Sequence, residues 1–220
     1  MPHDERDEIS PRRSLLVGAV LGALAGGLEL LGQLMLGALW GSRSLYDLCN
    51  LLSVLTPIIA VICLVTGVLG SLRWPSARRL ASGSLALLAV FMLVASFSTP
   101  VRRHGLGAVC ERLRPVTEAV KRHVEKHGSP PESLTALVPA ELPALPKPSS
   151  VLLHMHLDRR KYASPWALVV VLPGPPLQDK SLVYLSDGNY PPTPYRGGSG
   201  VPGLDGVGRI GDWAVLTTVD

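Results

Sequence analysis

The chain has 220 residues, 47% of them hydrophobic, with three cysteines and a formal net charge of +4. Three cysteines are too few for a scaffold built on disulfides. The positive charge is largely arginine beside long apolar runs, where arginine anchors helices at a membrane surface, so we expect a lipid bilayer and no nucleic acid as partner. These arginines are Arg12, Arg13, Arg73, Arg78, Arg79, Arg102 and Arg103.

Three apolar runs occupy most of the first hundred residues. Residues 14–42 contain Glu29 as their one ionisable side chain, and residues 48–72 and 80–101 contain none. Each run exceeds the roughly 18 to 20 residues that a helix needs to cross a bilayer core, and unbroken apolarity favours helices over barrel strands. The sequence predicts a cytoplasmic tail over 1–13, a transmembrane domain over 14–98 with helices at about 14–40, 50–72 and 80–98, and a soluble domain over 99–220.

The arginines of the short loops predict the orientation. Arg6, Arg12 and Arg13 precede the first run, and Arg73, Arg78 and Arg79 lie between the second and the third. The first loop holds only Arg43. Because positive loops stay on the cytoplasmic side, we expect a bacterial cytoplasmic (inner) membrane protein with its N-terminus inside and its C-terminal domain outside.

The first run carries polar residues and a glycine stripe. An ionisable group such as Glu29 inside a membrane is a candidate functional residue, and Gln33 lies one turn further on. Two alternatives remain open for Glu29: a hydrogen bond that links helices, or a role in binding a proton or ligand. Gly18, Gly22 and Gly26 allow another helix to approach closely, either a helix of the same chain or one of a second copy.

The pattern changes after Pro100. Apolar residues then recur at helical spacing, which predicts one amphipathic helix ending at Gly128. Thr99-Pro100 and Gly105 predict a break between this helix and the third apolar run, over Ser98–Leu106. The apolar face comprises Leu106, Val109, Cys110, Leu113, Val116, Val120 and Val124.

An antiparallel sheet is predicted for the remainder. Period-two alternation or short apolar β-branched runs indicate four strands, with a long Gly- and Pro-rich loop over 187–211. The predicted strands are 151–157, 166–172, 181–186 and 212–219. A long helix followed by such strands is an α+β domain.

Several short segments resemble the signature of pilin-like domains, including the pseudopilins of type II secretion. They run from Gly128 to Pro139 (GSPPESLTALVP), through Glu141-Leu142-Pro143 and Leu145–Pro148, to Gly211-Asp212-Trp213-Ala214. The resemblance implies a long helix packed on an antiparallel sheet of about four strands. The helix here follows a third span, and Leu80–Ser98 lacks the glutamate of a pilin stem, so the resemblance implies the fold without fibre assembly.

Candidate ligand sites are sparse. Asp187, Asn189 and Asp205 supply oxygens in the predicted loop, and some pseudopilins bind calcium in a comparable loop, but the spacing matches no EF-hand. Cys49 and Cys110 form either a disulfide or two unrelated thiols. Because no nucleophile, nucleotide or metal-site motif is found, we expect neither an enzyme nor a cofactor.

Two functions remain as hypotheses. The first is a membrane protein that displays its pilin-like domain as an interaction or scaffold module, with a protein partner at this domain or at the glycine stripe. The alternative is an oligomeric transport or channel component for small solutes that uses Glu29 in the membrane.

Overall fold

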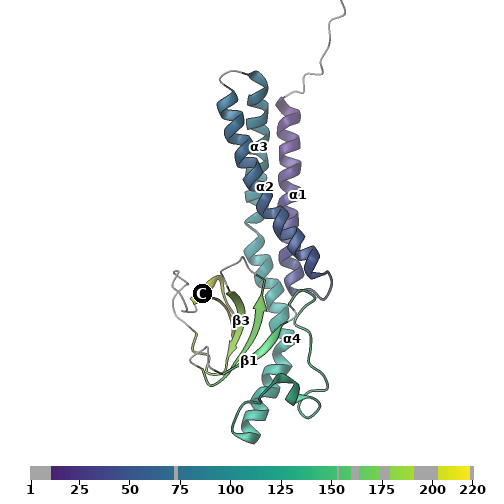
Figure 1. Ribbon diagram of the computed structural model, residues 1–220, viewed down its shortest axis with the longest axis vertical. Helices are drawn as coiled ribbons and strands as arrows, with labels where there is room; N and C mark the ends of the chain where they lie inside the picture. The colour runs from purple at the N-terminus through teal and green to yellow at the C-terminus, as the bar shows by residue number, and fades with distance from the viewer. Residues whose placement is uncertain are drawn as a thin grey trace, which may run out of the picture. The chain divides into compact units, whose positions relative to one another are not determined.

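The computed structural model describes residues 11–71, 74–152, 154–159, 164–173, 179–190 and 203–218 (Figure 1). Contacts divide the chain into two compact units. The first comprises Met1–Gln33 and Ser44–Ser98, and the second comprises Leu34–Arg43 and Thr99–Asp220. One division falls after Ser98, and residues 34–43, which the sequence assigned to the transmembrane part, belong to the second unit.

Three long helices build the first unit, and all three are long and apolar enough to cross a membrane. They are α1 (Pro11–Gly37), α2 (Arg43–Gly70) and α3 (Pro75–Ala95). Each begins three to seven residues before its predicted span, because backbone hydrogen bonds continue past the apolar segment into polar ends. Pro75 occupies the first turn of α3, where its missing N–H leaves no hydrogen bond unmade.

The fourth helix, α4 (Ser98–His127), begins earlier than expected. The two helices are separate elements, as predicted, but the break between them falls at Ser96 and Phe97 and not within Ser98–Leu106. Pro100 falls in the first turn of α4, where proline is tolerated. Gly105 lies inside the helix, and the backbone of Gly37 approaches it so closely that a side chain at Gly37 would overlap it.

The end of α4 agrees with the prediction. Gly128 has φ +70° and its N–H donates to the carbonyl of Val124 at 2.8 Å, as in a left-handed helix terminus. A 3-10 turn, η1 (Leu134–Leu137), follows and buries both of its leucines.

Five antiparallel strands form the sheet, in the order β1-β2-β3-β5-β4. They are β1 (Met155–Asp158), β2 (Ala167–Leu172), β3 (Asp179–Leu185), β4 (Gly203–Ile210) and β5 (Trp213–Thr218). The sequence predicted four strands, and β4 lies within the segment that was predicted to be a loop. β4 has no apolar alternation, and its pairing with β5 shifts register between Leu204 and Arg209; its backbone hydrogen bonds to β5 are what make it a strand.

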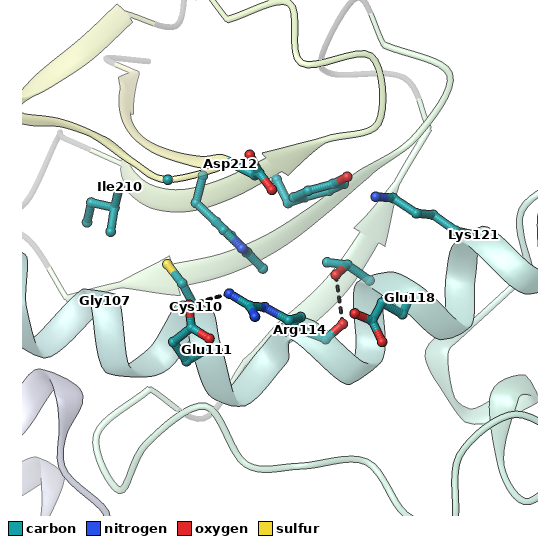
Figure 2. Close-up of a pocket in the computed structure, with 12 residues that line it drawn as sticks. Gly107, Cys110, Glu111, Arg114, Glu118, Lys121, Ile210 and Asp212 are labelled. Atoms are coloured by element: carbon teal, nitrogen blue, oxygen red, sulfur yellow. Dashed lines mark hydrogen bonds and ion pairs between the residues drawn. The ribbon is translucent and has the colours of Figure 1, made fainter.

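Both faces of the central strands are buried. One face holds a cluster that includes Val169, Val183 and Leu216, covered by Tyr190. The opposite face carries Tyr184 and Trp213 and is turned toward α4, which runs along it in Figures 1 and 2. The predicted apolar face of α4 is buried, since Leu106, Val109, Leu113, Val116 and Val120 are each 0% exposed. The class is therefore α+β.

The first strand is shorter than predicted. Val151 and Leu152 are both buried although they are neighbours, so this part of the predicted strand 151–157 is not an alternating strand. The Oγ of Ser149 accepts hydrogen bonds from both of their N–H groups, at 3.2 and 2.9 Å, and holds them in a turn. From Met155 onward the alternation is present, with His156 exposed between half-buried Met155 and Leu157.

Candidate functional site

A cleft of about 390 Å³ lies in the second unit between α4 and the turn that joins β4 to β5. Figure 2 shows Arg114, Glu118 and Lys121 along the helix, facing Ile210 and Asp212 of the hairpin. Gly211 has φ +59° at this turn, a conformation that glycine adopts without strain. Because the apolar face of α4 packs on the sheet, the polar residues next to that face lie over the β4–β5 turn.

The cleft has an aromatic wall. Tyr184 stacks on Trp166 with ring centroids 5.6 Å apart and meets Trp213 edge-on at 5.5 Å. The Lys121 Nζ lies 5.3 Å from the centre of the Tyr184 ring, within the range of a cation–π contact. The hydrogen bond with the Tyr184 side chain, followed by the charges of Asp212 and Glu118, raises the pKa of Lys121, so this amine stays positive at neutral pH.

Charges of both signs alternate along the rim. Arg114 and Glu111 form an ion pair at 2.6 Å, with about two thirds of each side chain exposed, so the pair adds little to stability. Glu118 and Lys121 continue the alternation one and two turns further along α4. A rim of mixed charge around aromatic rings matches the composition of protein–protein interfaces better than that of a site for a single ion.

Cys110 lies at the inner end of the cleft, with its sulfur pointing toward the sheet (Figure 2). Burial raises the pKa of this thiol to about 12. Because the thiolate is the nucleophile, Cys110 packs as an apolar group at neutral pH. Cys49, in the first unit, is also buried. Both cysteines are free thiols in the structure. A disulfide between them stays a prediction.

The two polar residues predicted to lie in the membrane, Glu29 and Gln33, are on α1. The Gln33 Nε2 donates to the Glu29 Oε1 at 2.8 Å, within one helix, and both side chains are half-buried. In α2 three hydroxyls each donate to a carbonyl of their own helix; these are Ser53, Thr56 and Thr66. Within the described residues the Gln33 Oε1 is buried without a hydrogen-bond partner.

The glycine stripe faces α3. A side chain at Gly18 would overlap the carbonyl group of Gly83, and one at Gly22 would overlap that of Leu87. At Gly26 the neighbour is the side chain of Val94. Of the alternatives that the sequence left open, the structure shows packing within the chain.

The candidate calcium ligands are Asp187, Asn189 and Asp205, and the structure describes the side chains of only the first two. The Asp187 carboxylate accepts a hydrogen bond from the Asn189 N–H at 3.1 Å, in the turn after β3. Asp205 lies in strand β4 instead of a loop, and its side chain is outside the described residues. In the described part of the chain no group of three His, Cys, Asp or Glu side chains is arranged to hold a metal ion.

The sequence did not single out two residues that organise the second unit. Tyr190 accepts from the Leu185 N–H at 2.9 Å and donates to the carbonyls of Val183 and Asp212, joining β3 to the hairpin beside the cleft. Arg112 of α4 donates to the carbonyls of Pro148 and Gly37. The tyrosine had no spacing signal, because its partners are backbone groups distant in the sequence.

Comparisons with family models, with characterised proteins and with solved structures give no match to this chain.

Proposed function

We propose that this protein is a three-span bacterial cytoplasmic-membrane protein that displays a pilin-like α+β domain outside the cell membrane as an interaction module. One observation carries the membrane part. Among the described residues, every large hydrophobic side chain that is exposed, apart from Val171, lies between Leu15 and Phe97. A water-soluble surface does not carry so much exposed apolar area, whereas lipid is its natural solvent.

Two exposed tryptophans support the same assignment. Trp40 follows α1 and Trp74 precedes α3, and they are 54% and 65% exposed. Tryptophan is enriched at both membrane–water interfaces.

The pilin-like assignment is supported by the order of elements in the second unit, where a long helix precedes an antiparallel sheet and packs on one of its faces. We assign the binding function to the cleft of Figure 2, because its aromatic wall and mixed charges suit a protein segment. The partner closes over Tyr184 and pairs its own charges with Arg114 and Lys121.

Topology and binding are tested separately. Single cysteines introduced at residues 75 and 220 should be labelled from the inside and the outside, respectively; labelling of both from one side removes a span. A photoreactive residue at Glu118, in the cleft, should form a discrete adduct in cells, and one at exposed Glu125 of the same helix should not. Equal adducts at both positions contradict a binding role for the cleft.

The buried, unpartnered Gln33 Oε1 beside Glu29 favours a second candidate, an oligomeric transport or channel component. A polar group buried without a partner is costly, and a bound solute would satisfy it. Glu29→Gln and Glu29→Leu separate the two functions. If the protein is an interaction module, both variants should form as much adduct at position 118 as the protein with Glu29. If it is a transport component, both variants should lose activity in a solute-uptake assay.

A further inference from the structure

A second concave site, distinct from the cleft, lies in the first unit. It is a groove of about 580 Å³ between the N-terminal turns of α1, the middle of α2 and the N-terminal half of α3. Its volume falls within the roughly 300 to 1,000 Å³ of sites that enclose small ligands. We refer to it as the helix groove.

The sides of the helix groove are mainly apolar. Val17 and Leu21 contribute from α1, Ile59 from α2 and Leu80 from α3. All four are between 47% and 57% exposed, so the groove opens on the surface that these helices would present to lipid. An apolar groove open to a bilayer is accessible to an acyl chain without any transfer through water.

Arginine lines the same groove. Arg13 lies in the first turn of α1 and Arg79 in the second turn of α3, and along each helix the apolar lining residues come after the arginine. The groove therefore has a cationic end and an apolar length. Guanidinium groups bind phosphate oxygens through paired hydrogen bonds, and the positive ends of both helix dipoles lie on the same side.

We propose that the helix groove binds an anionic phospholipid of the cytoplasmic leaflet, with the phosphate at Arg13 and Arg79 and one acyl chain along the apolar sides. The proposal rests on the membrane insertion proposed above. Charge complementarity selects this occupant, because the cytoplasmic leaflet is anionic and basic pockets between membrane helices bind anionic headgroups. A free anion would leave the apolar length unused, and a neutral lipid would bring no net negative charge to the cationic end.

The headgroup half is tested with two double variants of equal charge. Arg13→Gln with Arg79→Gln changes the groove, whereas Arg12→Gln with Arg78→Gln changes the exposed neighbours, which do not line it. The full chain is placed in nanodiscs of equal phosphatidylglycerol and phosphatidylcholine, and the lipids retained are counted by native mass spectrometry. We expect the first variant to lose the preference for phosphatidylglycerol by roughly fivefold per arginine, from the attraction of a basic residue to an anionic leaflet, and the second to keep most of it.

The acyl-chain half is tested by filling the groove. Cys63→Trp places a large ring among the lining residues of α2, and Ile62→Trp places the same ring on the neighbouring, exposed position. We expect Cys63→Trp to reduce retained lipid of both kinds and Ile62→Trp to leave it at the wild-type level. Wild-type protein should in addition be labelled around residues 56–63 and 83–87 by phosphatidylglycerol with a photoreactive acyl chain.

Three results would overturn the proposal. The first is an equal loss of preference in both arginine variants, which indicates general surface charge. The second is labelling spread evenly over the lipid-facing side of α2. The third is a protein-to-protein crosslink from a photoreactive group on Cys63, which assigns the groove to a second copy of the chain. Release of the wild type from membranes by alkaline carbonate would instead contradict the proposed membrane function, and only inserted protein enters the lipid comparison.

Discussion

The helical unit and the α+β unit bury leucine in opposite ways. Leu93 of α3 is 64% exposed, whereas Leu113 of α4 is 0% exposed. Both residues are leucines in long helices, and their helices are separated by only two residues. The proposed membrane insertion of α3 accounts for the difference, since exposed leucine is stable in lipid and costly in water.

The largest expected effect concerns this pair of leucines. Leu113→Ala should destabilise the α+β unit by about 2–5 kcal/mol, because it leaves a cavity in a closed core. Leu93→Ala should be nearly neutral to the unfolding of that unit. Thermal unfolding of the full chain in lipid nanodiscs, followed by near-UV circular dichroism, measures both, and equal losses would mean that the two regions do not differ as described. His154→Asp, on an exposed position, serves as a silent control within the α+β unit.

Glycine provides a second contrast, within the helical unit. Gly22→Ala should destabilise the packing of α1 on α3 by about 1–3 kcal/mol, because the new methyl group overlaps the backbone of Leu87 and forces a shift. Gly27→Ala meets no atom within 4 Å and should be neutral or slightly stabilising, since alanine favours helix. Unfolding in mixed detergent micelles compares the two variants. The same sign for both would contradict the close contact.

In the α+β unit the side chain of Tyr190 connects backbone groups of β3 and of the β4–β5 turn. Tyr190→Phe should cost about 1–3 kcal/mol, because the buried N–H of Leu185 loses its partner. Burial raises the pKa of Tyr190 to about 12. Stability from the neutral hydroxyl is therefore complete below the ordinary tyrosine pKa near 10 and is lost as the pH rises through 12. Between pH 9 and 12 the free energy of unfolding should fall more steeply with pH in the wild type than in Tyr190→Phe.

The smallest effect is expected at Glu141. The hydrogen bond and charge of Lys126, with a further contribution from Arg122, lower the pKa of this carboxyl. Its contribution is therefore present above the ordinary carboxyl pKa and is lost as the pH falls through the lowered value. Glu141→Gln should flatten the acid limb of the stability profile slightly, and Glu125→Gln, on exposed α4 surface, should leave it unchanged.

Apolar content and periodicity were sufficient to predict much of the fold. They predicted three long apolar helices, the buried face of α4, its end at Gly128 and four of the five strands. These features depend on local chemistry, since a side chain's solvent preference repeats with the period of its own element. The glycine stripe was likewise visible in the sequence. The sequence did not indicate that the helix packed against this stripe is α3.

Tertiary contacts decided the rest. β4 is a strand because β5 offers it backbone hydrogen bonds, and the backbones of Gly37 and Gly105 lie in close contact. The cleft combines α4 with a hairpin about ninety residues further along the chain, and the helix groove combines three helices. Each of these features depends on contacts between residues that are distant in the sequence. Local spacing along the chain does not predict such contacts. The sequence by itself therefore determined which surfaces avoid water, and the tertiary structure decided which residues those surfaces bring together.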